Sequence, residues 1–285
     1  FNGDDSFSFA VTDGGLSDTA EVTVSVSSVN DAPVLATVSN VSFDEDGSGS
    51  TSLSASDVDG DDLTFSITGG SDITATLDGS DVSFSAPDNY NGSETFSVSV
   101  SDGELSDSQT IAVTVNAVND APTANAASAI TNEDESVVVT LSGSDVDGDA
   151  LTYSLDTDAE NGSVIVSGTV ATYTPNQDFN GNDSFTFSVS DGELSATAEV
   201  TVTIESVNDA PVLAVVSNVS FDEDGSGSTS LSADDVDGDS LEFSISGGDQ
   251  ITASLDGTDV SFSAPENYNG SETFTVSVTD GELID

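Results

Sequence analysis

Carboxylates are almost the only side chains in this chain that could do chemistry. The sequence of 285 residues contains 54 Asp and Glu, four Tyr, and no Lys, Arg, His or Cys, which gives a formal charge of −54. Without an imidazole, a thiolate or an amine, general-base and covalent catalysis lose their usual participants. Pairs of carboxylates, as glycosidases use them, are the one remaining route. We therefore expect that the protein is not an enzyme.

The same charge balance limits the partners that the chain could bind. No side chain can neutralise a phosphate or an anionic lipid headgroup, so we expect no binding to nucleic acid and no membrane insertion. No carboxylate can form a salt bridge with a side chain, so each must face water, accept a neutral hydrogen bond or bind a cation from solution. Carboxylate oxygens in flexible Gly-containing loops, without His or Cys, favour Ca²⁺.

Three short motifs recur at a fixed interval and define a repeat. Val-Asn-Asp-Ala-Pro begins at positions 29, 118 and 207, which is a period of 89 residues. An aromatic-Asn-Gly motif and an Asp-Gly pair recur at the same interval. Such periodicity is typical of tandem repeat proteins. We expect the C-terminal strands of a partial repeat in 1–29, complete repeats in 30–118 and 119–207, and a repeat without its last strand in 208–285, so that the chain is a piece of a longer polypeptide.

Apolar and polar residues alternate within each repeat, with the period of β-strands. In the first complete repeat we expect about seven strands, among them Val34–Phe43, Ser50–Ser54 and Ile73–Leu77, separated by Asp-Gly, Asn-Gly and Gly-Gly turns. The pattern predicts an all-β chain of tandem seven-stranded Ig-like β-sandwiches. Only three or four residues link one repeat to the next, and each linker contains a Pro. We therefore expect the sandwiches to be arranged end to end.

The acidic motifs occupy loops that should converge where repeats meet. On a seven-stranded sandwich, the loops at Asp57-Val-Asp59-Gly-Asp61 and at Asp102-Gly103 lie at the end nearest the preceding linker. Glu45 and Glu94 lie at the opposite end. Two carboxylates about 6 Å apart in water repel by roughly 0.7 kcal/mol, so six clustered acids would cost on the order of 10 kcal/mol before screening. A bound divalent cation would remove that cost.

Several motifs together resemble those of cadherin repeats. Val11-Thr-Asp13-Gly followed by Val29-Asn-Asp-Ala-Pro33 is similar to the end of a cadherin repeat and its linker. Phe43-Asp-Glu45 and Ala55-Ser-Asp57-Val-Asp59-Gly60 resemble the cadherin opening Glu and its Asp-x-Asp loop. The chain resembles most closely the bacterial cadherin-like tandem repeats of giant secreted adhesins of the RTX type. This resemblance covers every repeat.

The resemblance implies calcium ligands at equivalent positions in each repeat. They come from the linker, from the Asp-x-Asp loop, from the Asp-Gly loop and from the Glu after the first strand. The implied linker ligands are Asn30, Asp31, Asn119, Asp120, Asn208 and Asp209. The implied loop ligands are Asp57, Asp59, Asp145, Asp147, Asp235 and Asp237, together with Asp102, Asp191 and Asp280. The implied glutamates are Glu45, Glu133 and Glu223.

The chain departs from the cadherin pattern in two places. Each linker has Ala where cadherins carry a further Asn, and the cadherin Asp-x-Glu motif before the sixth strand is missing. Asp88 or Glu94, and Asp178 or Asp183, are the available substitutes for that motif. The number of ions at each junction therefore stays open.

We expect a calcium-stiffened extender region of a large extracellular adhesin on a bacterial cell surface. It would project a binding tip for cell-surface or biofilm adhesion, with neighbouring repeats of the same chain joined through calcium. Two alternatives stay open. Each repeat could bind carbohydrate, with Tyr90, Phe179 and Tyr268 as the candidate aromatic contacts. The repeats could also form an extracellular fibre or surface layer through lateral contacts between like chains.

Overall fold

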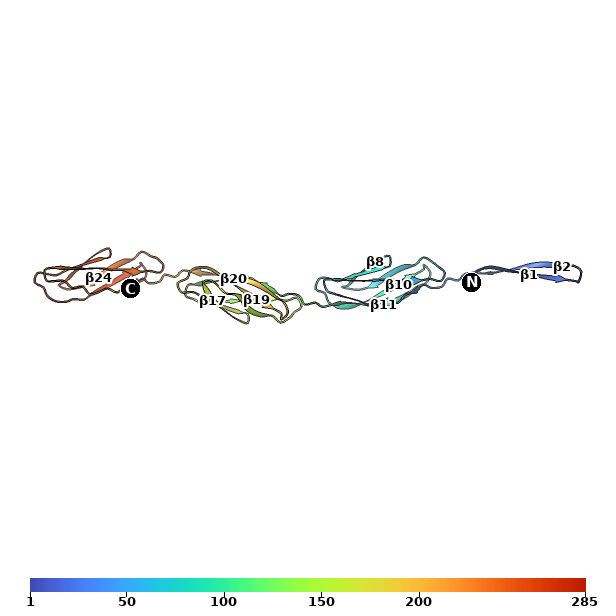
Figure 1. The fold of residues 1–285 in the computed structure, drawn as a ribbon, viewed down its shortest axis with the longest axis horizontal. Helices are drawn as coiled ribbons and strands as arrows, with labels where there is room; N and C mark the ends of the chain where they lie inside the picture. Colours follow the sequence, from blue (N-terminus) through green and yellow to red (C-terminus); the bar gives the residue numbers. More distant parts are fainter. The chain divides into compact units, whose positions relative to one another are not determined.

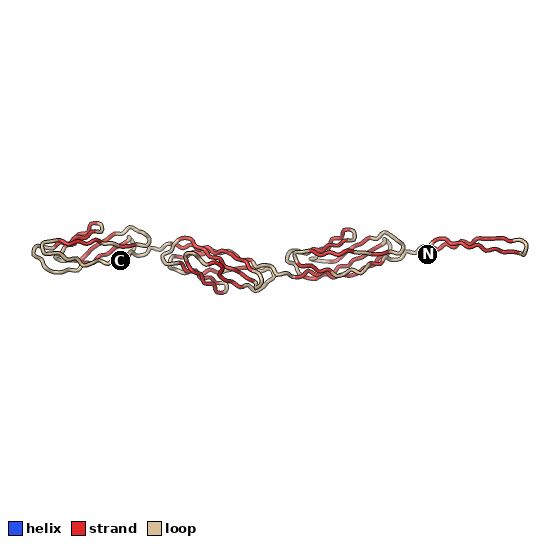
Figure 2. The backbone as a smooth tube through the Cα atoms, viewed as in Figure 1, coloured by secondary structure: helices blue, strands red, loops and turns tan.

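The computed structural model describes all residues 1–285 and consists of β-strands, turns and loops without any helix (Figure 2). It contains no helical segment of the length and hydropathy that a membrane span requires. The chain divides into two compact units, Phe1–Asp120 and Ala121–Asp285.

The first unit contains a hairpin followed by a nine-strand sandwich. The hairpin pairs β1 (Gly3–Thr12) with β2 (Ser17–Val26) in an antiparallel register. The strands of the sandwich are β3 (Val34–Leu35), β4 (Val41–Asp44), β5 (Ser48–Ser52), β6 (Ala55–Ser56), β7 (Thr64–Gly69), β8 (Thr74–Asp78), β9 (Asp81–Ser85), β10 (Gly92–Ser101) and β11 (Ser106–Asn116). Figure 1 shows β10 and β11 side by side.

Two sheets enclose the core of this sandwich. One has the order β4-β11-β10-β7, with β4 and β11 parallel, and the other has the order β5-β9-β8. A short third pair, β3-β6, lies at the start of the repeat. Alternate residues of each strand point inward, and Phe84 meets Phe96 edge to face with ring centroids 5.3 Å apart. The period-two pattern of the sequence is therefore the pattern of core packing, as an Ig-like sandwich requires.

The predicted first strand, Val34–Phe43, is wrong as one element because the chain leaves one sheet and enters another within it. The segment between β3 and β4 is held by the side chain of Gln109, whose Nε2 donates to the carbonyls of Leu35 (2.9 Å) and Ala36 (3.1 Å). The predicted second strand, Ser50–Ser54, is shifted relative to β5 (Ser48–Ser52) and ends before β6, which is a separate short strand. The predicted seven strands thus become nine short elements.

The second unit contains two more repeats of the same plan. The strands of the first are β12 (Thr123–Asn125), β13 (Ala127–Asn132), β14 (Val137–Thr140), β15 (Ser142–Ser144), β16 (Thr152–Thr157), β17 (Gly162–Ser167), β18 (Val170–Pro175), β19 (Gly181–Ser190) and β20 (Ser195–Glu205). The strands of the second are β21 (Val212–Leu213), β22 (Ser226–Ser230), β23 (Ala233–Asp234), β24 (Glu242–Gly247), β25 (Thr252–Asp256), β26 (Asp259–Ser263) and β27 (Phe274–Thr279). Their sheets are β13-β20-β19-β16 with β14-β18-β17, and β24-β27 with β22-β26-β25.

In each repeat, a carboxylate in or just before β10, β19 or β27 holds a loop in place. Glu94 accepts hydrogen bonds from the backbone N–H groups of Ser71 (2.8 Å), Asp72 (3.0 Å) and Ile73 (3.2 Å). The N–H of Asp72 is the largest of the effects that lower the pKa of Glu94. Because the folded pKa is lowered, the stability from these bonds is present at neutral pH and is lost as the pH falls through it. Glu272 is held by three backbone N–H groups in the same way.

In the middle repeat, Asp183 takes the place of Glu94 as the carboxylate that holds the loop. Asp183 is 8% exposed and accepts from the backbone N–H of Asn161 (2.9 Å) and from the hydroxyl of Tyr173 (2.9 Å). Tyr173 is fully buried where the first repeat has Phe84, and its burial raises the pKa of its hydroxyl. A buried hydroxyl without a partner is costly, so Tyr173 and Asp183 depend on one another.

We predict that Tyr173→Phe destabilises the middle repeat by about 2 kcal/mol, because the Asp183 carboxylate loses a buried charge-assisted donor. Differential scanning calorimetry, with hydrogen exchange to assign the transition to residues 121–207, measures the effect. The matched control is Tyr153→Phe, because the contact of Tyr153 with Phe187 is a stacking of rings with centroids 6.4 Å apart. Equal losses from the two substitutions would contradict the role given to the Tyr173 hydroxyl.

Candidate metal centre

Three carboxylates from different parts of the second unit meet at the linker that precedes its last repeat. Ligand oxygens of Glu133, Asp209 and Asp237 all lie within 4.8 Å of one another, and we call these three residues the junction cluster. The backbone brings them together: the N–H of Val207 donates to Glu133 Oε1 (2.5 Å), and the N–H of Asp209 donates to Asp237 Oδ2 (2.8 Å). The linker residues 207–209 are thus hydrogen-bonded to Glu133 in the preceding repeat and to Asp237 in the following one.

Glu133 is set in place by the sheet that precedes it. Its backbone N–H donates to the carbonyl of Glu205 (2.9 Å), which continues the parallel pairing of β13 with β20. The side chain is 4% exposed. A carboxylate is rarely buried to this extent unless a charge partner or a metal compensates it.

In the Asp-x-Asp loop, the two carboxylate oxygens of the first Asp lie in different environments. Asp235 Oδ1 accepts from the backbone N–H groups of Asp237 (3.0 Å), Gly238 (3.0 Å) and Asp239 (3.2 Å), which fixes the turn. Its other oxygen, Oδ2, is buried and has no hydrogen-bond partner. The equivalent Oδ2 atoms of Asp57 and Asp145 are buried and unpartnered as well. The same oxygen is therefore left available in every repeat.

Both oxygens of the Asp in the Asp-Gly loop accept hydrogen bonds from the protein. Asp280 Oδ1 accepts from the N–H groups of Glu282 (2.6 Å) and Leu283 (2.7 Å), while Oδ2 accepts from Asn208 Nδ2 (2.8 Å). The N–H of Leu283 and then the Asn208 amide lower the pKa of Asp280. In this structure the predicted ligands Asn208 and Asp280 therefore fasten the linker to the loop.

The first unit repeats these contacts at the start of its sandwich. Asn30 Nδ2 donates to Asp102 Oδ2 (2.9 Å), and the N–H of Asp31 donates to Asp59 Oδ2 (2.7 Å). The N–H of Leu105 is the largest of the effects that lower the pKa of Asp102. In the second unit, Asp191 Oδ1 accepts from Glu193 and Leu194 in the manner of Asp280, so the loop geometry is common to all three repeats.

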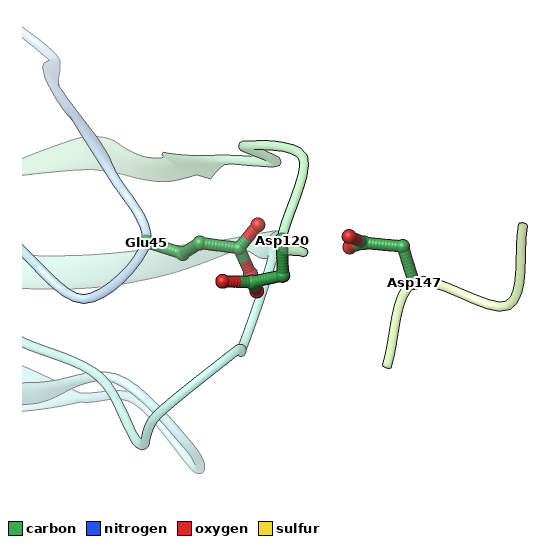
Figure 3. Close-up of side chains that lie close together, drawn as sticks. All are labelled: Glu45, Asp120 and Asp147. Carbon is green, nitrogen blue, oxygen red and sulfur yellow. The ribbon is translucent and has the colours of Figure 1, made fainter. Parts of the chain in front are cut away.

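The far end of the first sandwich carries the counterpart of Glu133. Glu45 is 6% exposed, its Oε1 accepts from the N–H of Val118 (2.6 Å), and its Oε2 is buried without a partner. Ligand oxygens of Glu45 and Asp120 lie within 4.8 Å of one another, and Figure 3 shows the two carboxylates turned toward each other. The predicted ligand Asn119 adjoins them, and its amide donates to the carbonyl of Asp120 (3.4 Å).

Sequence reasoning missed one acidic residue beside the junction cluster. Asp134 directly follows Glu133 and has a positive φ of 60°, a conformation that Asp tolerates better than most residues. Its Oδ1 accepts from the N–H of Asp178 (3.1 Å), and Asp134, Asp178 and Asp209 form a second group with ligand oxygens within 4.8 Å. The Glu-Asp pair recurs as Glu45-Asp46, which could have signalled it.

Other predicted positions do not join a cluster with the linker. Glu94 and Asp183 are occupied by the loops described above. Glu223 is exposed, because the segment before it is not a strand and has no counterpart of the parallel pairing of β4 with β11. Asp61 lies in the Asp-x-Asp loop, with a ligand oxygen within 4.8 Å of those of Asp57 and Asp59.

The junction cluster concentrates negative charge around Asp209. Burial raises the pKa of Asp209, and the neighbouring charges of Asp178, Asp237, Asp134 and Glu133 raise it further. No cationic side chain exists to relieve this repulsion. An all-oxygen ligand set with several carboxylates and buried unpartnered oxygens fits Ca²⁺.

A family comparison matches this repeated architecture directly. The model of the bacterial Ig domain matches residues 30–114, 119–203 and 208–283. The chain belongs to the bacterial Ig domain family. Its three bacterial Ig domains account for most of the sequence, and the predicted all-β tandem Ig-like fold is confirmed. A search of curated proteins returned no match.

Solved structures similar to these bacterial Ig domains include cadherins. Protocadherin gamma B7 extracellular cadherin domains 1–4 are 15% identical, with a TM-score of 0.51 over 93% of this chain and 76% of that one. Drosophila N-cadherin EC1–4 is 14% identical, with a TM-score of 0.38 over 97% of this chain and 79% of that one. An endo-fucoidan hydrolase of glycoside hydrolase family 107 is 23% identical, with a TM-score of 0.28 over 73% of this chain. The chain spans 34% of that hydrolase. The first of these likenesses supports a cadherin-like sandwich.

We predict that Asp237→Asn weakens calcium binding at this junction by about tenfold or more, because it removes one charge from the ligand set. Isothermal titration calorimetry of the whole chain measures the affinity. Asp256→Asn is the control, because it removes the same charge from an exposed residue at the end of β25. Equal effects of the two substitutions would show that calcium responds to net charge and not to the cluster.

We also predict that the effect of Asp209→Asn on the melting temperature has opposite signs without and with calcium. Without calcium, the substitution should raise the melting temperature of the last two domains, because it removes a carboxylate whose neighbours repel it. With saturating calcium it should lower the melting temperature, because a ligand is lost and binding stabilises the folded state less. Melting in EGTA and in CaCl₂ checks both signs. A decrease under both conditions would contradict the repulsion.

Proposed function

We propose that the three bacterial Ig domains form a calcium-stiffened extender region of a large extracellular adhesin. The observation that carries the proposal is a set of buried carboxylate oxygens without a hydrogen-bond partner in a chain without cationic side chains. They belong to Glu45, Asp57, Asp145, Asp209 and Asp235. Calcium bound there would fix the linker to the domains on either side of it. Neighbouring domains of one chain are then partners through the metal.

The linker explains why calcium would act on stiffness. In the second unit it is bonded by Val207 to Glu133 of one domain and by Asp209 to Asp237 of the next. Without a cation these two acids repel across the linker, which favours conformations that separate them. With a cation they bind the same ion, which favours one conformation. The result would be a chain of domains held end to end.

The family supports a location outside the cell. Bacterial Ig domains typically occur in surface and extracellular proteins, and we infer that this chain is displayed on a bacterial cell surface. The resemblance to RTX-type adhesins suggests a role in cell-surface or biofilm adhesion, with these domains as spacers for a binding tip. Calcium is abundant enough outside cells to fill sites of modest affinity.

We infer a structural role rather than a catalytic one, since Lys, Arg, His and Cys are all absent. The three aromatic residues predicted as contacts for the carbohydrate-binding alternative are all partly buried. Tyr90 and Phe179 are partly buried and pack against the cores of their domains. The hydroxyl of Tyr268 donates to Glu272 (3.2 Å), an acid that already holds a loop. None of the three presents a free ring to a sugar.

Small-angle X-ray scattering of the chain in CaCl₂ and in EGTA tests the proposal. We expect the maximum dimension to fall and the flexibility to rise when calcium is removed, because the linkers lose their shared ions. The double variant Glu133→Gln/Asp237→Asn should remain flexible in calcium, which separates the junction from general charge screening. Unchanged dimensions after calcium removal would refute the stiffening.

A further inference from the structure

The outer face of the three-stranded sheet in the middle domain carries an apolar row. Val138 on β14, Thr172 on β18 and Ile165 on β17 are directly paired across the sheet. Val138 is 63% exposed and Ile165 is 72% exposed. Both face away from the core, because their neighbours Val139 and Val164 are the buried residues of these strands.

The other two domains have polar residues in this row. The matching row of the first domain is Ser50, Ser83 and Thr76, and that of the last domain is Ser228, Ser261 and Ser254. Single exposed apolar residues are common and need no explanation. Here, however, two branched apolar residues replace hydroxylated ones in the same row of a repeat that is otherwise built alike.

The next row has lost its charges as well. In the middle domain it consists of Thr140, Val170 and Ser167. In the first domain the same row is Ser52, Asp81 and Asp78, and in the last it is Ser230, Asp259 and Asp256. Two carboxylates per domain are thus absent from the middle one. We call its two rows the neutral face, because none of their six residues is ionisable.

We propose that the neutral face is a contact surface between two copies of this chain. Each copy carries a formal charge of −54, so most faces of two copies repel one another when they approach. The neutral face brings no carboxylate to the contact and offers Val138, Ile165 and Val170 for burial. A basic partner would instead be attracted to the acidic faces of the other domains. The contact of a face with its own copy is isologous, with a two-fold axis through it.

The size of the face sets the strength of the contact. A sheet three strands wide and five residues long measures about 15 Å by about 17 Å. Two such faces bury far less than the ~1,200 Å² of a stable complex. Single chains should therefore associate weakly and reversibly, at high protein concentration and at an ionic strength that screens the remaining charge.

Disulfide trapping tests the proposal, because the chain has no Cys of its own. Thr172 is the middle residue of its row, so a two-fold axis through the neutral face places the two Thr172 positions close together. In CaCl₂ and 0.15 M NaCl with mild oxidant, Thr172→Cys should form covalent dimers about tenfold faster than Ser83→Cys, the matched position of the first domain. Equal rates would overturn the proposal.

Sedimentation equilibrium of chains without Cys provides the second measurement. The wild type should show concentration-dependent dimerisation that Val138→Ser/Ile165→Thr abolishes, while the reverse exchange, Ser50→Val/Thr76→Ile, should strengthen association. Both variants keep their inward residues, and circular dichroism checks that they fold. A wild type that stays monomeric at millimolar concentration, or that binds a glycan or lipid vesicle through this face without dimerising, would overturn the proposal. Neither result would bear on calcium at the linkers.

Discussion

Because no side chain in this protein is cationic, each of its 54 acidic residues must be accommodated in another way. The backbone N–H is the commonest partner that the structure provides. Asp57, Asp102 and Glu94 each accept two or more such bonds, and each shapes a loop by doing so. Backbone donors require no particular residue type, since every residue except Pro carries one. The Gly-rich turns supply them where acids are concentrated.

Near the linkers, backbone N–H donors do not reach every buried carboxylate oxygen. Asp280 and Asp209 illustrate the difference within a few residues of the same junction. Backbone and amide donors lower the pKa of Asp280, whereas burial and neighbouring carboxylates raise that of Asp209. The first acid is satisfied by the protein, and the second is left with a buried oxygen that no protein donor reaches. The sequence predicted both residues as calcium ligands, so the difference between their environments comes from the structure.

Much of this architecture could be predicted from the sequence, because it depends on local periodicity. The alternation of residues such as Phe96, Val98 and Val100 predicted both the strand and its inward face, and all three are buried. The break between β3 and β4 could not be predicted in this way, since it depends on the Gln109 side chain, which comes from the last strand. Local pattern indicates strands but not which sheet a strand joins.

Part of the candidate site could likewise be predicted from the sequence, and part could not. The pairing of Asp31 with Asp59 and of Asp209 with Asp237 follows from where loops lie on a sandwich, and the sequence predicted that they converge. The position of Asp134 beside Asp209 follows from a left-handed backbone conformation, for which Asp is only one permitted residue. Its sequence signal is the same as that of an ordinary turn.

The middle domain shows that near-identical repeats can still be kept distinct. It replaces Phe84 by Tyr173 and Glu94 by Asp183, and these two changes depend on each other because the hydroxyl bonds the carboxylate. If strands were exchanged between adjacent domains, Tyr173 would face the longer side chain of Glu94, and Asp183 would face the apolar ring of Phe84. The second mismatch removes the hydroxyl donor from the buried Asp183 carboxylate, which is costly. Tandem repeats are prone to this kind of misassembly. The paired substitution therefore favours correct folding of each domain while leaving the linker acids, which every domain needs, unchanged.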